Sequence, residues 1–407
     1  MKLTRKAFLR GLGGLAAAGG AGWVVPARLA EAAQKAGEGR KRPTITSVEV
    51  FPFNITLKQV IKIALGTPVV ADNVLVRLRT SDGVIGLGES SPYSAVMNET
   101  QSSDVALSRS LAGIVKGRDP FTLAQIVEAM DQFSPHSPGI KAAFEMALWD
   151  ICGKIAGQPV YRLLGGYRDS FETDQTVYLE TPAVAAEKAA AIAKKGFRHV
   201  KVKLGETPEM DVARIKAVRE ALGPDVGIRV DANQGWSVTD AVKTLRGLEP
   251  YNIQFCEQPV PYWDWAGLSR IRGNVPVPVM ADESIHSPHD VITGVRQDAM
   301  DMINIKLMKS GGILRAVQTA EVAEAANLPC MLGCMSETRV ALTAAAHVVM
   351  SQRICRYADL DAFLEHDVDP VAGGMQVTGG TVRLPDTPGL GLDIDPVFLK
   401  KLQPVAI

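Results

Sequence analysis

Five charged residues in the middle of the chain combine three carboxylates with two amines, each at the end of an apolar run. In chain order they are Lys203, Asp231, Glu257, Asp282 and Lys306. Successive members are 24 to 28 residues apart, which is about the length of one strand, one crossover helix and two short loops. Because the same ends of parallel strands lie together, we expect the five side chains to converge. Three carboxylates flanked by two amines would place a metal ion between two bases.

The three carboxylates predict a site for a hard cation. Asp231, Glu257 and Asp282 would end three adjacent strands, so their oxygens would reach one ion. Oxygen ligands without histidine or cysteine favour Mg²⁺, one per active site, with positions left open for substrate. One such carboxylate alone is more simply explained as a cap or ion-pair partner, but three between two lysines favour the metal. Asn233 would support the site through hydrogen bonds.

Two lysines of one strand are expected to face the same interior. Lys201 and Lys203 alternate with valines, so the amines share one face of the strand. Flanking helices would cover the valines, which leaves the lysines pointing inward. An amine in that position is costly unless it is paired or functional.

The lysines predict proton transfer at a carbon acid. We assign Lys203 as one base, and Lys201 as a charge that binds a substrate oxygen and, with the metal, lowers the pKa of Lys203. Lys306 would approach from the opposite wall. A carboxylate or amide bound to Mg²⁺ can lose its α-proton because the metal stabilises the enediolate. One lysine would remove the proton and the other would return one to the opposite face, which inverts the stereocentre.

The surrounding pattern predicts alternating strands and helices. Helix starts are marked where a hydroxyl residue precedes a proline, at Thr181-Pro182, Thr207-Pro208 and Ser287-Pro288. Eight parallel strands predict a closed barrel whose eighth helix is shortened or missing, a modified TIM (β/α)7β barrel in the α/β class. The expected strands lie near residues 173–178, 199–204, 227–231, 252–257, 277–282, 301–306, 330–335 and 354–359.

The flanking segments predict a second domain. Alternation at residues 45–50 and 74–78, followed by a helical pattern from 105 to 157, indicates an N-terminal α+β capping domain. The tail from Gly373 is interpreted as a hairpin that returns to this cap. The predicted division is an export signal and linker at 1–42, the cap at 43–172, the catalytic barrel at 173–370 and a C-terminal segment at 371–407.

Composition excludes some classes of partner. Lys+Arg and Asp+Glu both count 44 in 407 residues, so no net charge favours nucleic acid or an anionic membrane. The five cysteines are odd in number, and they are interpreted as small buried core residues without a structural disulfide. A metal site at Cys330 and Cys334 is not expected, because neither neighbouring segment offers partners at ligand spacing.

The N-terminus predicts export. Basic residues at 5, 6 and 10 precede a Gly/Ala-rich apolar stretch from 11 to 25, a pattern that resembles a twin-arginine signal with Lys6 in place of the second arginine. The apolar run is short for a membrane span. We therefore expect a periplasmic protein without stable membrane association once the signal is removed; the alternatives are a disordered tail or an uncleaved anchor.

Five motifs in order resemble the enolase superfamily, in the muconate-lactonizing-enzyme subgroup with lysines on both faces of the site. The resemblance covers about residues 44–395 and implies an α+β cap on a modified barrel, Mg²⁺ dependence and enolate chemistry. A mandelate-racemase-like site, with histidine in place of one lysine, does not fit. The motifs are Lys201-Val-Lys203, Asp231-Ala-Asn-Gln, Glu257-Gln-Pro, Ala-Asp282-Glu-Ser and Ile-Lys306.

A further motif, Asp359-Leu-Asp361, follows the eighth strand. By itself it is equally well explained as a solvated acidic turn. In the dipeptide epimerases of this subgroup an Asp-x-Asp at this position binds the α-ammonium of the substrate, and two carboxylates facing a cation are physically reasonable in a desolvated pocket. The resemblance therefore implies an isomerase that inverts the α-carbon of the C-terminal residue of an L,L- or L,D-dipeptide.

Cap loops select the substrate side chain in this family. Members that act on Ala-Glu often carry an arginine after an Ala-Leu pair, whereas this chain has Ala64-Leu65-Gly66, with Lys62 as a possible substitute. Both Ala-Glu and dipeptides with a neutral or hydrophobic second residue are therefore candidate substrates. Muconate-type cycloisomerisation, o-succinylbenzoate-type dehydration and a non-catalytic peptide-binding role are the alternatives. A homo-oligomer is expected from the resemblance alone.

Overall fold

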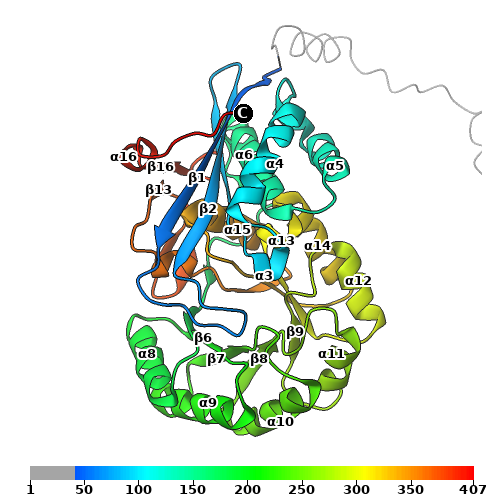
Figure 1. The fold of residues 1–407 in the computed structure, drawn as a ribbon, viewed down its shortest axis with the longest axis vertical. Coiled ribbons are helices and arrows are strands. Elements are labelled where there is room, and N and C mark those ends of the chain that lie inside the picture. The colour runs from blue at the N-terminus through cyan, green and yellow to red at the C-terminus, as the bar shows by residue number, and fades with distance from the viewer. Residues whose placement is uncertain (1–41) are drawn as a thin grey trace, which may run out of the picture. The chain divides into compact units, whose positions relative to one another are not determined.

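The computed structural model describes residues 42–407, so the predicted export signal lies outside the described residues. The cap begins with an antiparallel sheet in the order β1-β2-β3, and its helices pack against one face through a core that includes Val50, Val76 and Phe144 (Figure 1). Its elements are β1 (Ile45–Thr56), β2 (Val70–Thr80), β3 (Ile85–Ser90), α3 (Ser94–Met97), α4 (Gln101–Val115), η1 (Pro120–Thr122), α5 (Leu123–Phe133), α6 (Pro138–Ala156) and α7 (Val160–Leu163).

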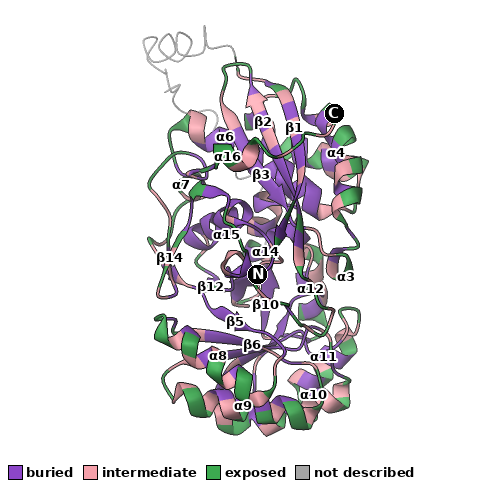
Figure 2. Ribbon diagram, turned by 60° about the vertical axis from the view of Figure 1, so that its left-hand side comes forward, coloured by how far each residue is buried: buried purple, intermediate pink, exposed green. Residues whose placement is uncertain are grey.

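Eight parallel strands form the second sheet, in the order β12-β11-β10-β9-β8-β7-β6-β5. Figure 2 shows these strands as buried and the outer faces of the surrounding helices as exposed. The strands are β5 (Gln175–Val177), β6 (His199–Lys203), β7 (Gly227–Asp231), β8 (Ile253–Glu257), β9 (Val279–Ala281), β10 (Met302–Ile305), β11 (Cys330–Leu332) and β12 (Cys355–Ala358).

Helices follow seven of these strands, as the α/β pattern predicted. Proline occupies the first turn of α8, α9 and α12, and the Thr207 side chain accepts a hydrogen bond from the Met210 amide. After β12 a short 3₁₀ segment, η3 (Ala362–Glu365), replaces the eighth helix. The helices are α8 (Pro182–Lys194), α9 (Pro208–Leu222), α10 (Val238–Leu248), η2 (Glu249–Tyr251), α11 (Trp265–Arg272), α12 (Pro288–Arg296), α13 (Leu307–Ser310), α14 (Ile313–Ala325) and α15 (Arg339–Ser351).

The eight strands form the curled sheet of the predicted modified barrel, and in the described part of the chain no ladder joins its edge strands β5 and β12. The two edges meet through single bonds: the Asp174 amide donates to the Ala358 carbonyl at 3.4 Å, and the Leu360 amide donates to Thr173 Oγ1 at 2.9 Å. The reason is that the chain just before β5 forms β4 (Phe171–Glu172), which pairs antiparallel with a C-terminal strand instead.

The C-terminal segment forms two small sheets and returns to the cap. Its hairpin, β14 (Gln376–Thr378) and β15 (Thr381–Arg383), pairs with β4, and β13 (Val371–Gly373) pairs with β16 (Leu392–Ile394) ahead of α16 (Pro396–Leu399). Near the end of the chain the Val405 amide donates to the Val50 carbonyl on β1 at 2.9 Å. The residue limits given above for the domains stay a prediction.

Buried carboxylates tie the cap to the barrel helices. Glu89 on β3 accepts hydrogen bonds from the amides of Thr338 and Ala341 at the start of α15. Glu145 on α6 accepts from the amides of Ile313 and Leu314 at the start of α14. Because helix N-termini carry unsatisfied amides, these carboxylates hold the cap over the carboxyl ends of the strands. Within residues 42–407, no helix combines the length and apolarity needed to span a bilayer.

Candidate active site

The structure brings the five residues at the strand ends together. Lys203 pairs in register with Asp231, and Asp231 with Glu257, across β6, β7 and β8. Asp282 and Lys306 directly follow β9 and β10. Lys203 Nζ lies 2.7 Å from Asp231 Oδ2, and Lys306 Nζ lies 2.8 Å from Asp282 Oδ2.

The two lysines stand on different walls of the sheet. Three strands, β7, β8 and β9, separate β6 with Lys203 from β10 with Lys306 in the strand order. In a curled sheet of eight strands that separation places their amines on opposite sides of the enclosed space. The carboxylate trio lies on the wall between them.

Lys201 lies deeper than its neighbour and contacts three carboxylates. Its Nζ is 3.1 Å from Asp231 Oδ2, 2.8 Å from Glu257 Oε2 and 2.7 Å from Asp359 Oδ2, with 1% of the residue exposed. Burial works to lower the pKa of Lys201, but the charges of these carboxylates raise it well above its usual value. Lys201 and Lys203 thus share Asp231 Oδ2, and the roles predicted for Lys201 toward substrate and toward the pKa of Lys203 stay predictions.

A fourth lysine that contacts the trio was missed by sequence reasoning. Lys309, one helical turn after Lys306 on α13, is fully buried and its Nζ lies 2.5 Å from Asp282 Oδ1. Burial works to raise the pKa of Asp282, yet Lys306 and Lys309 hold it far below its usual range. A Lys-x-x-Lys pair at a strand-to-helix junction was the available sequence signal, because helical side chains lean toward the preceding turn.

The donor set fits Mg²⁺. The three carboxylates are fully buried, and Glu257 Oε2 and Asp282 Oδ2 have ion-pair contacts but no hydrogen-bond partner within the described residues. Burial, then the charge of Asp231, raises the pKa of Glu257 to about 8, so a bound cation would favour its ionised form. Lysine ammonium groups lie between the carboxylates, and the ligand atoms of this trio do not all lie within 4.8 Å of one another in the described structure.

Hydrogen bonds from neighbouring amides orient the trio. The Asn233 amide donates to Asp231 Oδ1 at 2.8 Å, and its side-chain amide donates to Glu283 Oε1 at 3.2 Å. Asn304 Nδ2 donates to Glu257 Oε1 at 2.7 Å. Asn304 and Glu283 were not predicted from the sequence, since a polar residue in a buried strand or beside a ligand carries no spacing signal of its own.

Asp359 and Asp361 lie beyond β12, each 4% exposed, and both line the pocket. Burial raises the pKa of Asp359, but Lys201 and Lys203 outweigh it and keep that pKa well below its usual value. Asp361 Oδ2 accepts the Thr176 amide at 2.7 Å, and burial followed by the charge of Asp359 raises the pKa of Asp361 to about 8. The pair therefore offers one firmly ionised carboxylate and a second that a cationic ligand would help to ionise.

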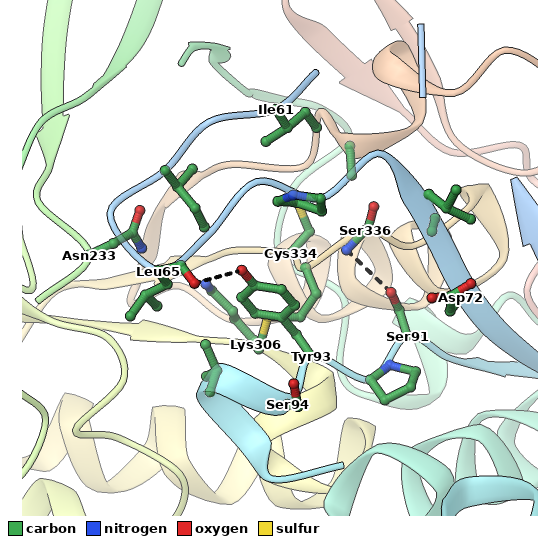
Figure 3. Close-up of a pocket in the computed structure, with 18 of the residues that line it drawn as sticks. Ile61, Leu65, Asp72, Ser91, Tyr93, Ser94, Asn233, Lys306, Cys334 and Ser336 are labelled. Atoms are coloured by element: carbon green, nitrogen blue, oxygen red, sulfur yellow. Dashed lines mark hydrogen bonds between the residues drawn. The ribbon is translucent and has the colours of Figure 1, made fainter. Parts of the chain in front are cut away.

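The pocket is a cavity of about 600 Å³ between the cap and the strand ends. Its barrel side includes both catalytic candidates, Lys203 and Lys306. Its cap side combines apolar and polar side chains, and Figure 3 shows Ile61, Leu65 and Tyr93 around the space that Lys306 enters. No arginine is found among the described residues that line it.

The loop between β1 and β2 covers this pocket and is docked on the barrel. The Leu179 amide donates to the Lys62 carbonyl at 2.9 Å, and the Tyr93 hydroxyl donates to the Leu65 carbonyl at 3.4 Å. The Lys62 side chain is 56% exposed, pairs with Glu206 at 3.3 Å and does not line the pocket. The loop therefore presents aliphatic side chains to the pocket and directs the Lys62 ammonium group toward solvent.

Comparisons with known proteins agree with this arrangement. Residues 45–165 match the family described as mandelate racemase / muconate lactonizing enzyme, N-terminal domain, and residues 183–397 match the enolase C-terminal domain-like family. A hydrophobic dipeptide epimerase of Enterococcus faecalis is 39% identical over 350 residues, which cover 86% of this chain and 99% of that protein. An L-Ala-D/L-Glu epimerase of Clostridium acetobutylicum is 35% identical over 352 residues, 86% of this chain and 98% of that protein.

A solved structure extends the likeness to three dimensions. The crystal structure of the dipeptide epimerase from Cytophaga hutchinsonii, complexed with Mg and the dipeptide D-Ala-L-Val, has a TM-score of 0.87 and 39% sequence identity, covering 89% of this chain and 99% of that one. The matches span the cap and the barrel together and confirm the resemblance drawn from the five motifs. The chain belongs to the enolase superfamily and, within it, to the dipeptide epimerase family.

Proposed function

We propose that this protein is a dipeptide epimerase, an isomerase that inverts the α-carbon of the C-terminal residue by proton transfer between Lys203 and Lys306. One observation carries the proposal: two amines on opposite walls of one pocket, with a buried carboxylate trio between them and the pair Asp359 and Asp361 at the same pocket. None of the alternative functions considered from the sequence uses the two lysines, the carboxylate trio and the aspartate pair together.

Each group of residues at the site has its own role in the proposed reaction. Asp231, Glu257 and Asp282 would hold Mg²⁺, which when bound supplies stabilisation of the negative charge that develops on the substrate carboxylate. Lys203 and Lys306 each face one side of the α-carbon, so one takes its proton and the other delivers one. Lys201 holds Asp231, Glu257 and Asp359 in place by its three short contacts.

The aspartate pair distinguishes a dipeptide from the anionic substrates of the alternatives. A free α-ammonium would find two carboxylates in a desolvated pocket, where charge-assisted hydrogen bonds are strong. A muconate-type or o-succinylbenzoate-type dianion would meet like charges there and be repelled. Cycloisomerisation and dehydration are therefore less well supported than epimerisation.

The test is exchange of the substrate α-proton in D₂O. A library of L,L-dipeptides incubated with the Mg²⁺-loaded protein should gain one mass unit at the C-terminal residue of the accepted members, with formation of the epimer. A peptide-binding protein without catalytic activity would bind the same dipeptides without any exchange, and that result would overturn the proposal.

Apolar dipeptides are the expected substrates. We expect kcat/KM for L-Ala-L-Leu to exceed that for L-Ala-L-Glu by about tenfold or more, since the aliphatic cap loop offers no cation to a buried glutamate carboxylate. Steady-state kinetics on both dipeptides measures the ratio. Lys62→Ala serves as the control: because Lys62 points away from the pocket, its loss should leave the ratio unchanged. A selective loss of activity on L-Ala-L-Glu in that variant would instead show that Lys62 takes part in recognising the glutamate side chain.

Asp361→Asn should weaken recognition of the free amino terminus. Loss of a charged hydrogen-bond acceptor predicts a fall in kcat/KM of about 10- to 100-fold, expressed mainly in KM. Comparing L-Ala-L-Leu with its N-acetyl form in both proteins measures the effect. The wild type should discriminate strongly and the variant weakly; equal turnover of both substrates by the wild type would remove the assigned role.

We also propose that the protein is exported to the periplasm through the twin-arginine route, as the N-terminal pattern predicts. Support comes from the basic residues and apolar stretch of residues 5–25. Fractionation of cells with and without the twin-arginine translocase, followed by sequencing of the mature N-terminus, tests the route. Assembly into a homo-oligomer likewise stays a prediction, to be measured by sedimentation.

A further inference from the structure

A thiol and two carboxylates converge at the pocket, apart from the Asp231, Glu257 and Asp282 trio. Potential ligand atoms of Cys334, Asp359 and Asp361 all lie within 4.8 Å of one another. Cys334 Sγ is 4.0 Å from Asp361 Oδ1, and all three residues line the pocket. Among the cysteines of the chain, all within the described residues, Cys334 is the one that is not buried.

Part of this group is already engaged and part is free. Asp359 Oδ2 contacts Lys201 Nζ, and Asp361 Oδ2 accepts the Thr176 amide, each at 2.7 Å. Asp359 Oδ1 is buried and has no hydrogen-bond partner within the described part of the chain. Asp174 lies beside Asp359, and burial followed by the charge of Asp359 raises the pKa of Asp174 well above its usual value, although Arg229 contacts it at 2.7 Å. Asp361 Oδ1 accepts a weak hydrogen bond from the Cys334 thiol, so Asp359 Oδ1 is the oxygen of the group without a partner.

We propose that Cys334, Asp359 and Asp361 form a second metal site, for a thiophilic divalent ion such as Zn²⁺ or Co²⁺. Binding forms one metal–sulfur and two metal–oxygen bonds, and the protons of the Cys334 thiol and of the Asp361 carboxyl are released to solvent. Three such ligands leave a fourth tetrahedral position for water. Sulfur ligation selects these ions over Mg²⁺, which prefers the all-oxygen trio.

The site would make such ions inhibitors that compete with substrate. The same two aspartates are the proposed ammonium subsite, so an ion held there excludes the dipeptide amino terminus. This part of the inference depends on the proposed function, whereas binding of the ion does not. A metal site that includes Cys334 was not expected from the sequence, because Cys334 and the aspartates follow two neighbouring strands, β11 and β12, and are not at ligand spacing.

Cobalt spectroscopy tests the binding. With excess Mg²⁺ present, Co²⁺ titration of the whole protein should produce a sulfur-to-cobalt charge-transfer band in the near ultraviolet, which an all-oxygen site cannot give. Cys334→Ser should lose the band, and Cys152→Ser, in the buried cap helix α6, should keep it. Calorimetric Mg²⁺ binding by Cys334→Ser verifies that the variant is folded. Absence of the band from the wild type, or its survival in Cys334→Ser, would overturn the site.

Competition tests the consequence for substrate. Addition of a free dipeptide should suppress the cobalt band, and its N-acetyl form should not. In turnover assays, Cys334→Ser should need about tenfold more Zn²⁺ for half-inhibition than the wild type. A band that persists at saturating dipeptide would leave the metal site in place but refute its overlap with the ammonium subsite. Failure of the proposed epimerase activity would be recognised separately, by the absence of α-proton exchange.

Discussion

Lys306→Ala and Lys203→Ala should each lower epimerisation by about 10³-fold, because each removes one of two general bases. No other described amine that lines the pocket can substitute for either. Lys309 is the nearest alternative to Lys306, but it is fully buried against Asp282. In Lys306→Ala the Asp282 carboxylate keeps Lys309 as its partner, so Mg²⁺ binding should be nearly intact by calorimetry.

Isotope exchange separates the two bases more sharply than turnover does. Each variant should still exchange the α-proton of the epimer whose proton faces the remaining lysine, and should fail with the other epimer. The two variants should therefore show opposite preferences between the L,L- and L,D-dipeptides in D₂O. Lys62→Ala, outside the pocket, is the matched lysine control and should behave as the wild type. Undiminished epimerisation in either active-site variant would contradict proton transfer between two lysines.

The placement of these lysines could be predicted because it follows from local pattern and chain length. Alternation puts Lys201 and Lys203 on one face of a strand, and the repeat of one strand plus one helix brings Asp231 and Glu257 to the same edge. Each step uses only neighbouring residues or a repeated spacing, so it needs no knowledge of distant contacts. The five strand-end positions and the missing eighth helix were accessible for that reason.

The features that sequence reasoning missed are set by contacts between distant segments. The sheet stays without a β5–β12 ladder because residues 171–172 pair with residues 381–382, more than two hundred positions later. Lys309 reaches Asp282 from a four-residue helix, α13, for which the Lys-x-x-Lys spacing with Lys306 was the available signal. Cys334 meets Asp361 from the next strand, so ligand spacing along the chain could not reveal it.

Burial also changed the expected electrostatics. The sequence predicted Lys201 as a charge that binds a substrate oxygen and tunes Lys203, and the structure gives it three carboxylate partners at 3.1 Å or less. Eight-stranded sheets enclose little water, so an amine inside one is stable only when anions surround it. The lysines of the site are thus stabilised by the carboxylates that they contact, and neither set can be altered alone without cost.

Asp282→Asn provides the strictest test of that balance. The neutral amide would leave Lys306 and Lys309, both buried, without the carboxylate that each contacts. Removing one partner of a buried ion pair predicts a loss of about 3 kcal/mol in the free energy of unfolding, measured by urea denaturation in EDTA. Loss of a metal ligand should also weaken Mg²⁺ binding by about 100-fold or more and abolish turnover.

The double variant Asp282→Asn, Lys309→Met separates stability from catalysis. Methionine fills much of the lysine volume without its charge, so part of the lost unfolding free energy should return even though Lys306 still lacks its carboxylate, while Mg²⁺ affinity and turnover should stay lost because the ligand is still missing. Lys309→Met alone should instead be destabilised, since Asp282 then keeps a single cationic partner. If Asp282→Asn proved as stable as the wild type in EDTA, the ion pairs around Asp282 would not be what holds the metal-free site together, and the trio would owe its geometry to backbone packing alone.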